Sequence, residues 1–193
     1  MPNLPPSPRG TLFASALGFV VVLLDVSVVN VALDDLRRTW HADMATLQWV
    51  VNAYTLVFAA LLLTSGALGD RLGARRVFLA GFAVFTLASV ACGLAPGEQT
   101  LIAARLLQGL GAALLVPNSL SMLQRAFKNP QARSHAVGWW GAAGGIALAA
   151  GPVLGGILVE HWGWRSIFLI NLPVGVVGLS LIHISEPTRR RGI

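Results

Sequence analysis

Six apolar stretches follow one another along the chain, each about 20 residues long, which is the length that crosses a bilayer core of about 30 Å. They cover residues 12–33, 47–68, 77–95, 101–123, 136–159 and 167–182. A segment that lies in lipid has to satisfy its own backbone hydrogen bonds, so each stretch is predicted to be a helix. Only 11% of the 193 residues are charged, against about 25% in soluble domains. The alternative, a soluble all-α protein, would seldom repeat buried helices of this length, and we predict an all-α, polytopic membrane protein.

The basic residues gather in the short loops on one side of the predicted helices. With the N-terminus in the cytoplasm, the inside segments hold Arg9, Arg71, Arg75, Arg76, Arg125, Lys128 and Arg133. The outside loops hold Arg37, Arg38 and Arg165. Because cytoplasmic loops are enriched in Lys and Arg, we predict a cytoplasmic N-terminus in an inner or plasma membrane. These loops account for the net charge of +6, and no basic stripe with interleaved aromatics indicates nucleic acid.

Two charged residues, Asp25 and Arg105, lie well inside the predicted spans. A charge at the bilayer centre costs about 2.5–3.5 kcal/mol, so such residues are candidates for a functional site. Desolvation disfavours the charged form of a carboxylate, which would let Asp25 exchange protons. Arg105 stays charged and could hold a nearby carboxylate ionised or drive a proton off it. With their polar neighbours Asn30 and Gln108, they form a candidate proton or substrate coupling site. The alternatives are a purely structural ion pair for Asp25 and snorkelling to the outer interface for Arg105.

The segment GALGDRLGARRVFL joins the second and third spans on the predicted inside. Its candidate functional residues are Gly66, Gly69, Asp70, Arg71, Gly73, Arg75 and Arg76. Glycines permit a tight turn and a close helix approach, and an aspartate there can pair with a guanidinium or cap the next helix. A merely topological basic loop would explain the arginines but not the spacing of the Gly and Asp residues.

The fifth span is rich in small residues around the run GPVLGG. Pro152 lacks a backbone donor and is expected to kink the helix, while Gly151, Gly155 and Gly156 allow close packing on another helix. The alternative is ordinary small-residue packing, which is common in membrane helices. The tryptophans at the ends of the predicted spans, namely Trp139, Trp140, Trp162 and Trp164, are expected at the membrane interfaces.

Motifs for soluble cofactor chemistry do not occur in the sequence. No GxxxxGK[ST], HExxH or CxxC pattern is present, so neither an ATP site, a metal site nor any other cofactor is predicted. The lone cysteine, Cys92, lies in an apolar run and is expected to be a small buried residue.

Five motifs in order resemble the major facilitator superfamily, and in particular its fourteen-helix drug:proton antiporter branch. They read LLDVSVVNVAL, GALGDRLGARRVFL, LIAARLLQGLGAALLVP, GPVLGG and WGWRSIFLINLPVG, and the resemblance covers about residues 12–178. It implies that the chain is the six-helix N-terminal half of such a transporter. Ala147 departs from the pattern, because the antiporter motif often begins with Gly.

The resemblance also implies roles for individual residues. Asp25 matches an acid implicated in proton or drug coupling, and Arg105 matches an arginine tied to proton translocation. Asp70 and Arg71 match a gating loop that locks the outward-facing state. The antiporter helix is matched by Gly151, Pro152 and Gly155.

The function that follows is proton-driven efflux of drugs or other lipophilic, often cationic, small molecules. Its expected partners are the lipid bilayer, protons, the substrate and a missing C-terminal half. A symporter or uniporter for a small metabolite is the alternative. A membrane protein without transport is disfavoured by the buried charges, and a membrane enzyme is disfavoured because no nucleophile and base can be paired.

We divide the chain into a cytoplasmic tail, residues 1–11, and a bundle, residues 12–182, that is truncated in its sixth helix. Residues 179–193 begin with LSLIHISEPTR, which looks like a translated sequencing adapter and is predicted to be non-native. The alternative is a genuine basic tail.

Overall fold

The computed structural model describes residues 8–184, and all of its regular structure is helical. The helices are α1 (Pro8–Trp40), α2 (Met44–Leu72), α3 (Ala74–Gly93), α4 (Glu98–Ala126), α5 (Pro130–Trp162), α6 (Ser166–Leu169) and α7 (Asn171–Ile184). The first five are long and apolar enough to cross a membrane. The predicted all-α class is therefore confirmed, and most helices extend a few residues beyond the predicted spans.

The sixth span is interrupted at Ile170, between α6 and α7, although Ile170 itself keeps helical backbone angles (φ −61°, ψ −25°). Pro173 explains the break: its ring lacks an N–H and clashes with the carbonyl four residues earlier, which belongs to Leu169. The predicted origin of residues 179–193 stays a prediction, since residues 185–193 lie outside the described part.

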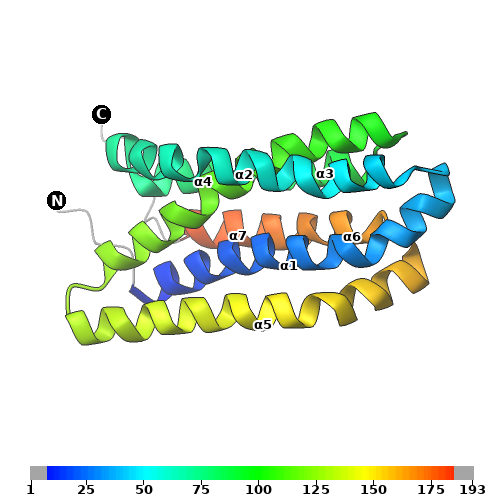
Figure 1. The fold of residues 1–193 in the computed structure, drawn as a ribbon. Coiled ribbons are helices and arrows are strands. Elements are labelled where there is room, and N and C mark those ends of the chain that lie inside the picture. The colour runs from blue at the N-terminus through cyan, green and yellow to red at the C-terminus, as the bar shows by residue number, and fades with distance from the viewer. Residues whose placement is uncertain (1–7, 185–193) are drawn as a thin grey trace, which may run out of the picture.

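The long helices form two packed groups, α2, α3 and α4 in one and α1 and α5 in the other, and α1 and α4 contact each other where the groups meet. Figure 1 shows α2 and α3 above and α5 below, with α1, α6 and α7 in the middle. Helix α4 packs on α2 and α3 and also crosses α1, which itself packs on α5 and α7. In α2 and α5, 22% of the most apolar window is buried, against 50% in α1 and α4. The central helices α1 and α4 therefore contribute much of the interior.

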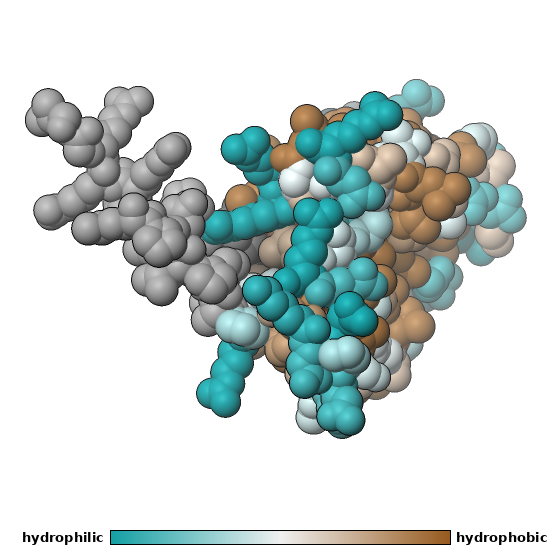
Figure 2. Space-filling model, turned by 90° about the vertical axis from the view of Figure 1, so that its left-hand side faces the viewer, coloured by the Kyte–Doolittle hydropathy of each residue, from teal (hydrophilic) through white to brown (hydrophobic). Residues whose placement is uncertain are grey.

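Hydrophilic side chains cover the end of the bundle that holds the α2–α3 and α4–α5 turns. Figure 2 views the molecule from this end and shows these side chains in front of hydrophobic flanks. The exposed basic residues Arg71, Arg76, Arg125, Lys128 and Arg133 all belong to these turns or to the helix ends beside them. Polar ends and apolar flanks are what a bundle that spans a bilayer requires.

Trp164 is not at a lipid interface, contrary to the prediction. Only 2% of it is exposed. It packs edge-on against Trp40, with 4.9 Å between ring centres, and its backbone N–H donates to Asp35. A tryptophan that follows a helix end is thus used here to close the α1–α5 side of the core, whereas Trp139 and Trp162 are exposed.

Candidate functional site

Asp25 and Arg105 meet inside the bundle, where the central helices α1 and α4 face each other. Arg105 Nη1 lies 2.6 Å from Asp25 Oδ2, and the two side chains are 1% and 0% exposed, respectively. Snorkelling of Arg105 to the outer interface is excluded by this burial. Because an unpaired buried charge is very unfavourable, each of these groups needs the other in place.

Gln108 completes the pair from one turn further along α4. Its Nε2 donates to Asp25 Oδ1 at 2.7 Å and to Ser89 Oγ at 2.8 Å. Its Oε1 accepts from Arg105 Nη1 at 2.8 Å and lies 3.5 Å from Cys92 Sγ. The amide of Gln108 is therefore fixed in one orientation by its neighbours.

Arg105 also contacts α2 and α6. Its Nε donates to the backbone oxygen of Val50 at 3.1 Å. Its guanidinium carbon lies 4.3 Å from the centre of the Tyr54 ring and 5.9 Å from that of Phe168. Aromatic faces attract a desolvated cation, and these rings form an apolar wall around the charge.

Three members of this network were not predicted from the sequence: Ser89, Tyr54 and Asn171. Asn171 Nδ2 lies 3.3 Å from Asp25 Oδ1 and 3.2 Å from Ser89 Oγ. The polar Asn171 in the apolar run WGWRSIFLINLPVG was an available signal. Ser89 and Tyr54 carried none, because such residues occur in many membrane helices without a polar role.

Asn30 does not join the network, although it was predicted beside Asp25. Its side chain is exposed, and its Nδ2 donates to the backbone oxygen of Val26 in the preceding turn at 3.1 Å. Five residues after Asp25, it points to a different face of α1.

The chemistry available to this network is proton exchange at one carboxylate. Asp25 is the only carboxylate for which a contact with these residues is recorded in the described chain. Among residues 8–184, no group of three or more His, Cys, Asp or Glu side chains could hold a metal ion.

The predicted gating loop is mostly helical: only Gly73 lies between α2, which ends at Leu72, and α3, which begins at Ala74. Gly73 ends α2 with φ of 95°, a conformation that favours glycine. Asp70 Oδ1 accepts from Arg125 Nη2 at 2.9 Å, an exposed pair that ties α2 to α4. A side chain at Gly69 would overlap Asn118 of α4, and Gly66 lies near Pro117. Arg71 and Arg76 are exposed, whereas Arg75 is half-buried and has a partner.

The predicted antiporter helix packs closely on α1 through some of its glycines. A side chain at Gly151 would overlap Ser27, and one at Gly155 would crowd Val28. Ser27 Oγ donates to the backbone oxygen of Leu148 at 2.9 Å, which adds a polar link between the helices. Gly156 faces open space and Pro152 is exposed, while α5 continues through Pro152 as one helix.

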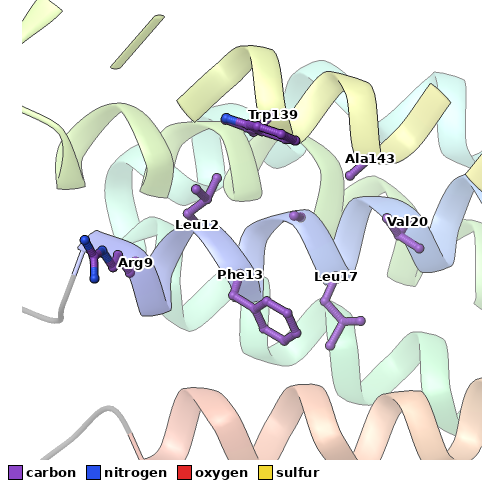
Figure 3. Close-up of a pocket in the computed structure, with 8 residues that line it drawn as sticks. Arg9, Leu12, Phe13, Leu17, Val20, Trp139 and Ala143 are labelled. Atoms are coloured by element: carbon purple, nitrogen blue, oxygen red, sulfur yellow. The ribbon is translucent and has the colours of Figure 1, made fainter. Parts of the chain in front are cut away.

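An open groove of about 460 Å³ lies on the outside of the bundle between α1 and α5. Figure 3 shows its apolar lining, which includes Phe13, Leu17 and Trp139, with Arg9 at one end. None of the network residues lines it. The candidate site is therefore the enclosed polar network and not this groove.

Comparison with known proteins shows that the chain is similar to the Major Facilitator Superfamily and to several resistance proteins. The sequence profile of the Major Facilitator Superfamily matches residues 15–192. A methylenomycin A resistance protein of Streptomyces coelicolor is 46% identical over 88% of this chain and 36% of its own length. The multidrug resistance protein Stp of Mycobacterium tuberculosis is 44% identical over 94% of this chain and 34% of its own length. The tetracenomycin C resistance and export protein of Streptomyces glaucescens is 42% identical over 89% and 32%. The chain thus spans about a third of the length of these relatives.

Proposed function

Because the chain belongs to the Major Facilitator Superfamily, we propose that it forms the N-terminal part of a transporter that exports drugs or other lipophilic small molecules in exchange for protons. The names of its relatives, which are resistance and export proteins, support this substrate class. The substrate would bind near the middle of the membrane, between this bundle and a second one.

The observation that carries the proton coupling is the enclosed Asp25–Arg105 pair between α1 and α4. A proton that arrives from outside binds Asp25 and cancels the charge that holds Arg105. The interaction between the two central helices then weakens, which favours a rearrangement that opens the drug site outward. Loss of the proton to the cytoplasm restores the pair. The cation and the two amides favour the ionised carboxylate, so the pair with Arg105 forms again when the proton leaves.

The test joins residues 1–178 of this chain to the remaining length of the S. coelicolor relative and measures dye efflux from inverted vesicles. We expect an imposed proton gradient to drive efflux in the parent chimera. Asp25→Asn should reduce it to the level of empty vesicles. Asn52→Asp, which changes an exposed side chain on α2, controls for a change of charge elsewhere. Undiminished gradient-driven efflux in Asp25→Asn would remove Asp25 from the coupling role.

The same vesicles separate antiport from the alternative of symport or uniport. In an antiporter, the substrate moves against the direction of the protons. Movement of the dye in the same direction as the protons, or equilibration without any gradient, would replace the proposal by the alternative.

A further inference from the structure

Asn171 lies at the junction of α6 and α7 and reaches the polar network with its side chain. Pro173 ends α6 at Leu169 and lets α7 begin at Asn171, whose side chain is buried. The backbone of Ile170 stays helical, with φ of −61° and ψ of −25°, so Asn171 follows α6 with little change of direction.

Close packing of α7 on α3 fixes this position further. A side chain at Gly175 would overlap Thr86, and one at Gly178 would crowd Phe82. Gly175 and Gly178 follow Asn171 by four and seven residues, so all three lie on one face of α7. That face meets Ser89, Thr86 and Phe82 of α3 in antiparallel order.

The two oxygens of Asp25 are not equivalent as proton acceptors. Oδ2 lies 2.6 Å from Arg105 Nη1, a group that keeps its protons. Oδ1 faces two neutral amides, Gln108 at 2.7 Å and Asn171 at 3.3 Å. A proton on Asp25 is therefore expected on Oδ1. The new O–H group there faces two N–H donors, whereas it needs a hydrogen-bond acceptor.

Asn171 is the neighbour that can supply this acceptor. Turning the amide of Gln108 would bring its Nε2 against the N–H of Arg105, from which its Oε1 now accepts. Both recorded bonds of Asn171 are long and run from Nδ2, to Asp25 and to Ser89. Rotated by half a turn, its Oδ1 accepts from Asp25 Oδ1–H and from the hydroxyl of Ser89.

We propose that Asn171 is a positioning residue that reverses its hydrogen bond when Asp25 takes up a proton. It donates to the ionised carboxylate and accepts from the protonated one, so that both states of Asp25 are satisfied in a site closed to water. This proposal rests on the proton exchange proposed above. The charged and titratable groups around Asp25 are Arg105 of α4, Cys92 of α3 and Tyr54 of α2. On the other side of α1, α5 presents glycines.

The test uses the 193-residue chain in lipid nanodiscs, with carbon-13 in its asparagine side chains, and records infrared spectra during a pH titration. Asp25→Asn assigns the carboxylic acid band of Asp25. Asn171→Leu, which has a similar size but no amide, assigns the amide carbonyl band of Asn171. If Asn171→Leu does not fold, Asn171→Ser is used to assign the amide carbonyl band.

We expect the Asn171 carbonyl band to move to lower wavenumber on acidification, with the same midpoint as the appearance of the Asp25 acid band. The shift should be lost in Asp25→Asn. An acid band for Asp25 with a stationary Asn171 band would overturn this inference and leave the proposed function standing. Absence of an Asp25 acid band throughout the pH range in which the chain stays folded would overturn both.

Discussion

Arg105 neutralises Asp25 where water has no access, so we predict that removing the cation destabilises the bundle. Arg105→Leu should lower the free energy of unfolding by about 3–5 kcal/mol, the range for breaking a buried ion pair. The loss should shrink as the pH falls, because protonation removes the stranded charge of Asp25. Circular dichroism during thermal unfolding of the chain in detergent measures both effects.

A second substitution shows whether the charge is the cause. Asp25→Asn combined with Arg105→Leu leaves no buried charge and should recover part of the stability lost in Arg105→Leu alone. If the double variant is as unstable as the sum of the two single variants, lost packing and not the stranded carboxylate explains the effect.

The sequence pointed to Asp25 and Arg105 because the cost of burying a charge in a membrane is a local property of each span. It pointed to Gln108 because that residue follows Arg105 by one helical turn. It could not reveal Ser89 or Tyr54. Their importance depends on which helices lie beside α1 and α4, and that is decided by packing between spans. Asn30 was wrongly predicted for the same reason: it lies close to Asp25 along the chain, but its side chain is on an exposed face of α1.

Among the helices, α5 tests how far close packing depends on single glycines. Gly151→Ala adds a methyl group that would overlap Ser27 of α1. We expect a loss of about 1–3 kcal/mol, as is usual for overpacking. Gly156→Ala is the matched control because its added carbon meets nothing within 4 Å. It should be neutral or stabilising, since Ala is better than Gly in helices by up to about 1 kcal/mol. Equal thermal shifts for the two variants would refute this account of the α1–α5 contact.

The start of α2 depends on an aspartate cap. Asp43 Oδ1 accepts from the backbone N–H of Thr46 at 2.8 Å. This hydrogen bond, followed by one from the Thr46 side chain, lowers the pKa of Asp43 from 3.8. Because the pKa of Asp43 is lowered in the folded state, the ionised cap stabilises α2 at pH values above the pKa of the unfolded chain. This support is lost as the pH falls through the lower pKa of the folded state.

We therefore predict that Asp43→Ala speeds hydrogen exchange at the Thr46 amide at neutral pH, and that Asp43→Asn, which can still cap, does so less. Acidification should speed exchange in the parent chain relative to Asp43→Asn, after correction for intrinsic rates. Identical protection of the Thr46 amide in all three proteins would mean that the cap is unimportant.

At the scale of helices, apolar length predicted the five long apolar helices and their order, but it did not show that the sixth span is shorter and interrupted at Ile170. A hydrophobic stretch such as residues 167–182 gives the same signal whether or not its helix is continuous. The interruption at Ile170 follows from Pro173, which offers no N–H to the carbonyl of Leu169, and Asn171 lies directly after it, beside Asp25.

For the whole molecule, orientation in the membrane is a prediction that labelling can test. Cys92 is the only cysteine of the chain, so Cys92→Ala gives a background without thiols. Into it we would place Gln99→Cys, at the predicted outer end of α4, or Arg76→Cys, at the predicted inner end of α3. In intact cells, a membrane-impermeant thiol reagent should label the first and not the second. The opposite pattern would reverse the proposed path of protons and substrate.

The least buried helices, α2 and α5, offer surface for the proposed second bundle. Large hydrophobic side chains stay exposed along α2 and α5, among them Trp49, Leu63, Ile146 and Val153. Lipid can cover some of them, but a substrate cavity needs a second wall, and the chain covers only about a third of its relatives. We therefore predict that the 193-residue chain alone gives no dye efflux above background, although it folds.

Joining the same residues to the rest of the S. coelicolor relative should restore gradient-driven efflux in the vesicle assay. The comparison has to be made at equal amounts of membrane-inserted protein, since a poorly inserted chain would also be silent. Robust efflux by the chain alone would mean that two copies can pair through the exposed faces of α2 and α5 and enclose a cavity between them. In that case a cross-link between Trp49→Cys residues of two copies, in the Cys92→Ala background, should form in the active sample and abolish its efflux, because alternating access requires the two walls to move apart.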